Sequence, residues 1–244
     1  MKEKDEQENI YPYRMERGYR VNQAKGLIAL GLFKDYDDIR NSPKQTFGNY
    51  MPGDIKYKDV NGDGIIDDQD QGATTVPNLV YGIGVSAQWK GLDVNVHFQG
   101  AGKSSFFIDG EGVRPFASGN RGNFYQEVID GRWISKEESG TIATENPHAK
   151  YPRLSYGYND NNNRNSSYWL RNGSYLRLKT LEVGYTLPKK IVNRIHFNNI
   201  RIYMIGTNLI TWSKFKMWDP EMNSSNGATY PLAKSVTVGL NVNL

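Results

Sequence analysis

The residues best suited to chemistry form a twelve-residue acidic loop from Asp59 to Asp70. Side-chain oxygens fall at its first, third, fifth, ninth and twelfth positions, and the seventh residue offers a backbone carbonyl. The predicted ligands are Asp59, Asn61, Asp63, Ile65, Asp67 and Asp70. Gly64 stands at the sixth position, where a calcium-binding loop turns sharply, and calcium takes about six to eight oxygen ligands. The spacing therefore predicts a Ca²⁺ site with a structural role.

Two features of this loop limit what the ion could do. Asp70 stands where such loops usually carry Glu, which shortens its reach for bidentate binding. No helical pattern flanks the loop on either side, so we expect the ion to stiffen an extracellular loop and not to act as a sensor. The alternative is a solvated turn, rich in Asp, Asn and Gly, between two strands.

A second set of candidates consists of aromatic residues in a long polar stretch, Gly100–Gly173. Aromatic rings present flat surfaces that stack on sugar rings, which makes these residues candidates for substrate contact. They are Tyr125, Trp133, Tyr156 and Tyr158. The alternative is that they pack within the loop.

Catalytic chemistry has little support in the sequence. Cysteine is absent and His is 3, which excludes thiolate sites and leaves little for a His-built centre. Carboxylates such as Asp109, Glu111 and Glu127 are better explained as solvated charges than as an acid/base pair. We therefore expect no enzyme and no catalytic residues.

The composition narrows the class of protein. The chain has 244 residues with Lys+Arg 30 and Asp+Glu 26, and the resulting net charge of +4 argues against nucleic acid. No apolar run reaches the about 18 residues that a transmembrane helix needs. The first residues, MKEKDEQENI, give no sign of a signal peptide. Gly 25, Tyr 16, Phe 9 and Trp 5 are typical of a β-rich protein.

Period-2 patterns predict the elements that must position these residues. Val80–Trp89 and Leu92–Gln99 form a hairpin in which apolar and polar residues alternate, and Val236–Leu244 alternates without a break. Ser174–Leu187 alternates only in its second half. Arg177 and Lys179 share the parity of its apolar residues, so they lie beyond the apolar zone or a bulge intervenes.

Two further segments complete the pattern. Ile200–Trp212 is a strand candidate that is apolar on both parities, so its faces stay unassigned, and Tyr19–Phe33 is a weaker candidate. Lys34–Asn41 is the best short helix, and Pro188–Asn199 reads as a connecting turn.

Short connections at one end of the strands and long ones at the other are typical of outer-membrane barrels. The predicted fold is all-β, with antiparallel transmembrane barrel strands and long extracellular loops. An antiparallel sheet on the surface of a soluble domain is the alternative.

Several motifs resemble one known family. Gly53–Asp67 reads GDIKYKDVNGDGIID, and Ser167–Lys179 reads SYWLRNGSYLRLK. Further matching stretches are Pro77–Gly84, Trp89–Asp93, Phe98–Gly100, Tyr151–Leu154, Gly184–Pro188, Gly206–Leu209 and Trp218–Glu221. In order and spacing the sequence resembles the C-terminal part of SusC/RagA-type TonB-dependent transporters of the Bacteroidetes outer membrane.

The resemblance implies a function and partners. Such proteins import oligosaccharides or oligopeptides through a barrel of about 22 strands, gated by a plug. TonB–ExbB–ExbD supplies the energy, a SusD-like lipoprotein closes the mouth, and lipid surrounds the barrel in the outer membrane.

The same resemblance sets the expected domain organisation. Residues 1–244 would be the C-terminal part of such a barrel, with the plug and early strands absent, because five or six strands cannot close it. The loop 59–70 would lie within it. The rival hypothesis is a soluble, calcium-stabilised β-sandwich that binds glycans, and a secreted glycoside hydrolase comes last.

Overall fold

The computed structural model describes residues 11–15, 17, 25–73, 79–119, 123–139, 149–222 and 224–243. The chain divides into two compact units. The first unit comprises Met1–Val76 and Phe106–Arg171, and the second comprises Pro77–Ser105 and Asn172–Leu244. Every helix in the described part of the chain is too short or too polar to cross a bilayer.

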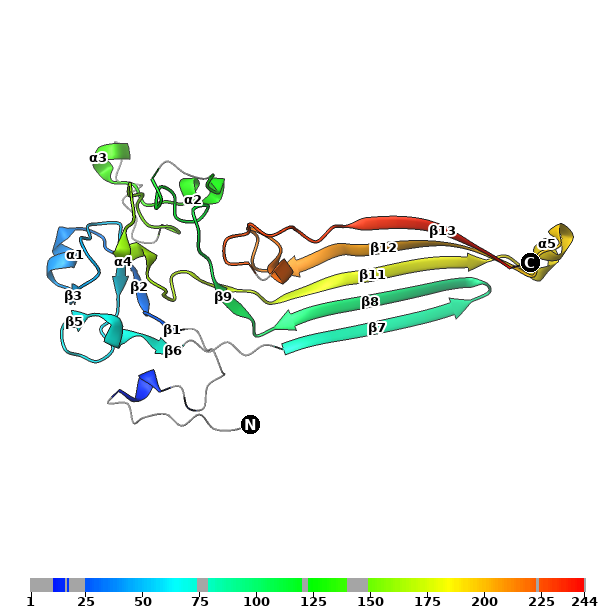
Figure 1. The fold of residues 1–244 in the computed structure, drawn as a ribbon, viewed down its shortest axis with the longest axis horizontal. Helices are drawn as coiled ribbons and strands as arrows, with labels where there is room; N and C mark the ends of the chain where they lie inside the picture. The colour runs from blue at the N-terminus through cyan, green and yellow to red at the C-terminus, as the bar shows by residue number, and fades with distance from the viewer. Residues whose placement is uncertain are drawn as a thin grey trace. The chain divides into compact units, whose positions relative to one another are not determined.

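The second unit is built on one five-stranded antiparallel sheet, in the order β13-β12-β11-β8-β7 (Figure 1). Its strands are β7 (Leu79–Trp89), β8 (Leu92–Gly102), β11 (Tyr175–Thr186), β12 (Asn199–Ser213) and β13 (Ser235–Asn243). All five predicted strands are confirmed, with boundaries that agree within three residues. Only Leu244, predicted to end the last strand, lies outside the described residues.

One face of this sheet is apolar across all five strands. Cross-strand pairing aligns Val85, Val96, Leu181, Gly206 and Val236 in one row. The next two rows are Ala87–Val94–Val183–Met204–Val238 and Trp89–Leu92–Tyr185–Ile202–Leu240. Side chains alternate between the faces of a strand, so the period-2 pattern of each strand puts its apolar residues together.

A β-bulge keeps this face continuous along β11. The register of β11 shifts between Leu178 and Thr180 against both of its neighbours, β8 and β12. The extra residue, Lys179, reverses the parity, so Leu176 and Leu178 join the apolar face and Arg177 turns to the opposite one. Of the two predicted explanations for Arg177, the bulge is the correct one.

The two ends of the sheet carry connections of different length. Lys90 and Gly91 join β7 to β8 in a two-residue turn with φ of 46° and 88°, as type I′ hairpins require. At the same end, α5 (Lys189–Val192) and a 3₁₀ helix (Asn193–Ile195) join β11 to β12 (Figure 1). The predicted turn at Pro188–Asn199 is therefore partly helical. The connection from β12 to β13 at the opposite end runs over residues 214–234.

The first unit consists of short elements. Its strands pair as β1 (Lys25–Gly26) with β6 (Gly72–Ala73), β2 (Ala29–Leu32) with β4 (Ile55–Tyr57), and β3 (Lys44–Gln45) with β5 (Ile65–Ile66). A further two-stranded sheet joins β9 (Ser105–Phe107) to β10 (Leu170–Asn172). The helices are α1 (Tyr36–Arg40), α2 (Gln126–Asp130), α3 (Lys136–Ser139) and α4 (Asp160–Asn163), with 3₁₀ turns at Pro12–Arg14 and Asp68–Asp70.

Two sequence predictions fall in this unit. The helix predicted at Lys34–Asn41 is α1, whose N-cap Asp35 accepts a hydrogen bond from the Asp38 amide at 2.7 Å. The weak strand candidate Tyr19–Phe33 corresponds in part to β1 and β2, and residues 19–24 of it lie outside the described residues.

The core of the first unit draws on both of its chain segments. Phe33, Ile55 and Ile66 from the first segment are fully buried, as are Ile108 and Trp169 from the second. The stretch Gly100–Gly173, expected from its composition to be a polar loop, therefore supplies much of a folded core.

Candidate functional site

The acidic loop is closed by hydrogen bonds between its carboxylates and its own backbone. Asp59 accepts from the amides of Gly62 at 2.6 Å and Gly64 at 2.8 Å. Asp63 accepts from the Ile65 amide at 2.8 Å. Gly62 and Gly64 have φ of 78° and 82°, a left-handed conformation that glycine adopts without strain. These contacts curl the chain into a tight turn, in which Asp59 is partly buried and Asp63 is exposed.

Asp70 joins the end of the loop to its beginning. Its side chain is fully buried and accepts hydrogen bonds from the amides of Val60 at 2.7 Å and Asp67 at 2.9 Å. Ile66, also fully buried, anchors the loop through β5, while Ile65 is exposed. The fold thus ties the twelfth position of the predicted calcium loop to the backbone of its second position.

The oxygen ligands that the loop offers suit a hard cation such as Ca²⁺. Its carboxylates do not converge on one point in this structure. Among the described residues, no three His, Cys, Asp or Glu side chains converge as they do around a metal. Asn61 and the Ile65 carbonyl are ligand types that such a count leaves out. The carboxylates instead accept backbone amides, which preorganises a loop of suitable length and composition.

The four aromatic candidates lie in different surroundings within the first unit. Tyr156 and Tyr158 are exposed to 76% and 68%, and their rings are open to solvent. Trp133 is only 7% exposed, and its ring packs on Gly53, where a Cβ would overlap it. The Tyr125 ring lies close to Gly112. The structure does not bring the four residues into a single aromatic platform.

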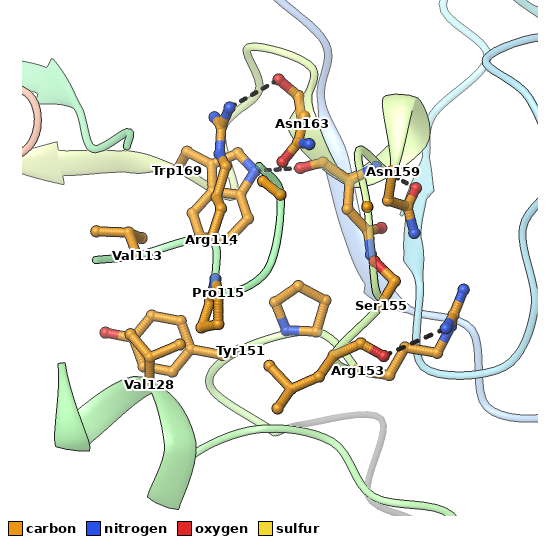
Figure 2. Close-up of a pocket in the computed structure, with 15 residues that line it drawn as sticks. Val113, Arg114, Pro115, Val128, Tyr151, Arg153, Ser155, Asn159, Asn163 and Trp169 are labelled. Atoms are coloured by element: carbon orange, nitrogen blue, oxygen red, sulfur yellow. Dashed lines mark hydrogen bonds between the residues drawn. The ribbon is translucent and has the colours of Figure 1, made fainter. Parts of the chain in front are cut away.

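A small cavity is lined by side chains that include Val128, Tyr151 and Trp169 (Figure 2). Its volume of about 30 Å³ is comparable with that of one water molecule. Arg114 lies over the Trp169 ring at 5.1 Å and donates a hydrogen bond to the Asn163 carbonyl at 3.1 Å. Burial lowers the pKa of Arg114. This cavity is too small for a nutrient molecule and belongs to the core.

A much larger cleft of about 830 Å³ opens elsewhere on the same unit. We call it the Trp133 cleft. Trp133, Tyr36, Met51 and Pro52 provide its apolar lining. Its charged lining residues are Lys34, Asp35, Arg132, Glu137, Glu138 and Arg153. Of the four aromatic candidates, only Trp133 lines this cleft. The sequence analysis assigned no binding role to Arg132 or Arg153.

A buried polar network around Asp54 positions Arg153, which lines the cleft. Asp54 is fully buried and binds the Arg153 guanidinium through its Nε at 2.9 Å and its Nη2 at 3.0 Å. It also accepts hydrogen bonds from Asn162 at 2.8 Å and the Met51 amide at 2.9 Å. A carboxylate buried with this many donors fixes Arg153 in one position. The Arg153 guanidinium therefore has a fixed position at the cleft, and its charge is balanced by Asp54.

The network continues into the strand pairs of the unit. The Gln45 side-chain oxygen accepts a hydrogen bond from the Tyr57 amide at 2.7 Å. The Tyr57 hydroxyl donates one to the Asn161 carbonyl at 2.6 Å. Burial raises the pKa of Tyr57 well above its ordinary value. Sequence analysis missed this network, because a run such as Asp160–Asn163 has the composition of a solvated turn.

The polar face of the sheet in the second unit carries a charged cluster. Arg201 of β12 contacts Asp93 of β8 and Glu182 of β11, at 3.1 Å from its Nε to Asp93 and 2.5 Å from its Nη2 to Glu182. Gly184 leaves the space that the guanidinium fills. The three side chains are between 16% and 22% exposed, so the ion pairs are partly shielded from water.

A second charged cluster on this face ties the β12–β13 connection to β11. Arg177 is 1% exposed and lies 2.5 Å from Asp219 and 3.3 Å from Glu221. Lys179 lies 3.4 Å from Glu221. The bulge at Lys179 is what directs Arg177 to this face.

Sequence comparison with known proteins identifies relatives that share one description. No protein-family model matches the chain. The chain is 31% identical to TonB-dependent receptor P26 of Formosa agariphila, over 92% of this chain and 23% of that protein. It is 25% identical to TonB-dependent receptor P3 of the same organism, over 88% of this chain and 22% of the relative. The chain thus spans about a quarter of the length of these relatives.

Solved structures show the same kind of fold. The RagAB peptide importer in its open-open state matches with a TM-score of 0.64 and 20% identity, over 93% of this chain and 23% of the other. The closed-closed state matches with a TM-score of 0.62 and 20% identity, over 94% of this chain and 24% of the other. At this level of identity the likeness concerns the fold.

Proposed function

Because the chain belongs to the family of TonB-dependent receptors, we propose that it forms part of the barrel wall of an outer-membrane nutrient importer. In this role the chain carries out no catalysis. It separates lipid from a water-filled lumen and contributes loops on the extracellular side. The named relatives are receptors, which agrees with a transport role.

The observation that carries this proposal is the exposed apolar face of the five-stranded sheet. Val85, Val96, Leu181, Val183 and Val238 lie in its central rows, and Val85 and Val238 are 62% and 71% exposed. In water such a face would drive association, whereas in lipid it needs no cover. A β-sandwich would bury this face under a second sheet, so its exposure favours the barrel over the soluble glycan-binding alternative.

Strand length and aromatic placement agree with a membrane span. β7 and β8 have 11 residues each, and a transmembrane β-strand needs about 9–11. Trp89 and Tyr185 lie in the row nearest the short turns, while Tyr81 and Trp212 lie at the other end of the same face. Aromatic residues at both edges of an apolar band are typical of outer-membrane barrels.

A pair of substitutions on neighbouring residues tests the two-faced sheet. We expect Val96→Arg to block assembly in the outer membrane, because a charge near the bilayer midplane costs about 2–4 kcal/mol. Asn95→Arg, on the opposite face of the same strand, is the control and should assemble normally. Fractionation of cells that express the full-length protein measures both. Equal assembly of the two variants would contradict the proposal.

The partners follow from the same proposal. We expect energy from TonB–ExbB–ExbD and an extracellular lid formed by a SusD-like lipoprotein. Support comes from the sequence resemblance and from the fold shared with the RagAB importer. Purification of the full-length protein from its native membrane should bring such a lipoprotein with it. The cargo would be an oligosaccharide or an oligopeptide.

The acidic loop is proposed to bind calcium in a structural role. Asp59, Asn61, Asp63, Asp67 and Asp70 would supply side-chain oxygens, and Ile65 its carbonyl. We expect Asp63→Asn to weaken calcium binding at least about tenfold, because it removes a charged ligand. Asp68→Asn is the matched control, since Asp68 lies in the same loop outside the ligand positions. Calcium titration of the full-length protein measures both, and an equal effect of the two changes would contradict the proposal.

A further inference from the structure

Basic residues gather at the end of the five-stranded sheet that carries the short connections. The Gly91 carbonyl accepts a hydrogen bond from the Thr186 amide at 2.8 Å, so the β7–β8 turn lies beside the start of the β11–β12 connection (Figure 1). The exposed cations of these two connections, which we call the basic rim, are Lys90, Lys189, Lys190 and Arg194. Four positive charges thus lie at one end of the sheet.

The basic rim receives no counter-charge from the part of the chain that the structure describes. The sequence contains no Asp or Glu between Glu182 and Asp219. On the polar face of the sheet, the carboxylates of Asp93 and Glu182 are both paired with Arg201. Among the described residues, none forms an ion pair with a member of the rim. The rim therefore stays positive and open to an anionic surface.

Exposed apolar side chains accompany these charges. Ile191 and Ile195 are 50% and 49% exposed, whereas Val192 between them is buried. The two isoleucines stand four residues apart, as do Lys190 and Arg194, so each pair lies about one helical turn apart along the connection. Apolar residues beside Lys and Arg are typical of a short segment that lies in a membrane interface.

The apolar face of the sheet extends up to this connection. The Leu187 amide donates to the Ile200 carbonyl at 2.9 Å, and Ile200 pairs with Val242. By parity these three residues lie on the apolar face, one row beyond the row that contains Trp89. The Lys90 ammonium group lies over the Trp89 ring, 4.7 Å from its centre. A lysine beside an exposed tryptophan at the edge of an apolar band is placed to reach lipid headgroups.

This combination favours a lipid surface over other surroundings. A fully solvated turn explains the charges but leaves both isoleucines in water. A protein surface would need carboxylates and an apolar patch in matching places. An anionic phospholipid offers both parts in one molecule, because its phosphate attracts Lys and Arg and its acyl chains accept apolar side chains.

We propose that the basic rim, together with Ile191 and Ile195, binds anionic phospholipid headgroups at the periplasmic surface of the outer membrane. The short turns of such barrels face the periplasm. The proposal rests on the barrel function proposed above and adds a lipid-binding site to it. This site would hold the sheet at a fixed depth, with the row of Trp89 at the edge of the hydrocarbon.

The test uses the full-length protein, freed of other cysteines, with a bimane fluorophore on Ile195→Cys. The protein is reconstituted in vesicles of equal parts phosphatidylglycerol and phosphatidylcholine, in which only one of the two lipids carries bromine as a quencher. We expect brominated phosphatidylglycerol to quench the label at least about twofold more than brominated phosphatidylcholine, and salt to reduce the difference. Equal quenching by the two lipids would overturn the proposal.

Paired variants locate the preference in the basic rim. Lys190→Gln combined with Arg194→Gln should remove the difference between the two lipids. Lys214→Gln combined with Lys216→Gln is the control, because both lysines are exposed in the connection at the opposite end of the sheet. The control should keep the difference, and an equal effect of the two double variants would refute the site.

A second label separates this inference from the barrel proposal. Bimane on Val96→Cys, in a central row of the apolar face, should be quenched by both brominated lipids. Quenching at Val96 without quenching at Ile195 would mean that the connection does not reach lipid, and only the present inference would fail. Absence of quenching at Val96 would contradict the barrel itself.

Discussion

At the scale of single residues, Asp54 shows how one carboxylate organises a region with little regular secondary structure. It contacts Met51, Arg153, Asn159 and Asn162, which come from two segments about 100 residues apart. Buried polar groups that are fully paired hold one arrangement of the chain. Removal of one partner leaves another charge without compensation, which costs more than the pair itself contributes.

We therefore expect Asp54→Asn to lower the opening free energy of the first unit by about 3 kcal/mol. This is the low end for a broken buried pair, because the Arg153 side chain is 19% exposed and can reach water. Hydrogen exchange at the amides of Ile55 and Tyr57 measures the loss. Asp37→Asn is the control, since Asp37 forms a surface pair worth at most about 1 kcal/mol. Similar exchange in both variants would contradict this view of Asp54.

At the scale of elements, the bulge in β11 decides which residues face outward. Residues on the two sides of Lys179 have opposite parity, yet Leu178 and Leu181 lie on the same face. The bulge therefore allows β11 to keep its leucines on the apolar face while Arg177 is buried on the polar face.

A pair of deletions in β11 tests this role of parity. Deletion of Val183, in the regular part of the strand, should prevent assembly of the sheet in the membrane, because it would move Glu182 to the apolar face. Deletion of Lys179 is the control and should be tolerated, because Leu178 and Thr180 already pair with the adjacent residues Phe98 and His97 of β8 and Arg177 stays on the polar face. Resistance of the folded barrel to unfolding in SDS at room temperature distinguishes the two. Folding of the Val183 deletion to the same extent as the Lys179 deletion would contradict this view of the strand.

The elements also show how far sequence could predict this structure. β7, β8 and β13 alternate cleanly, so their faces follow from the pattern alone. β12 carries Met204 and Ile205 on opposite faces, and only the pairing with β11 and β13 assigns them. In the first unit, strands of two to four residues depend on contacts such as Asp54 with Asn162, which local sequence does not encode.

The candidate sites divide in the same way. The acidic loop is contiguous, so its spacing is visible in the sequence, and the fold closes it through Asp70. The Trp133 cleft joins residues near 34, 51, 132 and 153, and only Trp133 had been singled out beforehand. Charges that meet through the fold, such as Arg132 and Glu137, have no local signature.

At the scale of the whole molecule, the sheet has two open edges. β7 and β13 each pair with one neighbour in the five-stranded sheet. Unpaired edge strands are costly in lipid, so in the intact barrel we expect both to pair with further strands. This agrees with a chain that spans about a quarter of the length of its relatives.

The central claim is that one face of this sheet meets lipid and the other meets water. The chain has Cys 0, so spin labels can be placed at chosen sites in a full-length background freed of other cysteines. Labels at Val85, Val96 and Val238 should be more accessible to oxygen, which dissolves in lipid. Labels at Ser86, Asn95 and Thr237 should be more accessible to a water-soluble nickel complex. Equal accessibility of the two sets in reconstituted membranes would contradict the account.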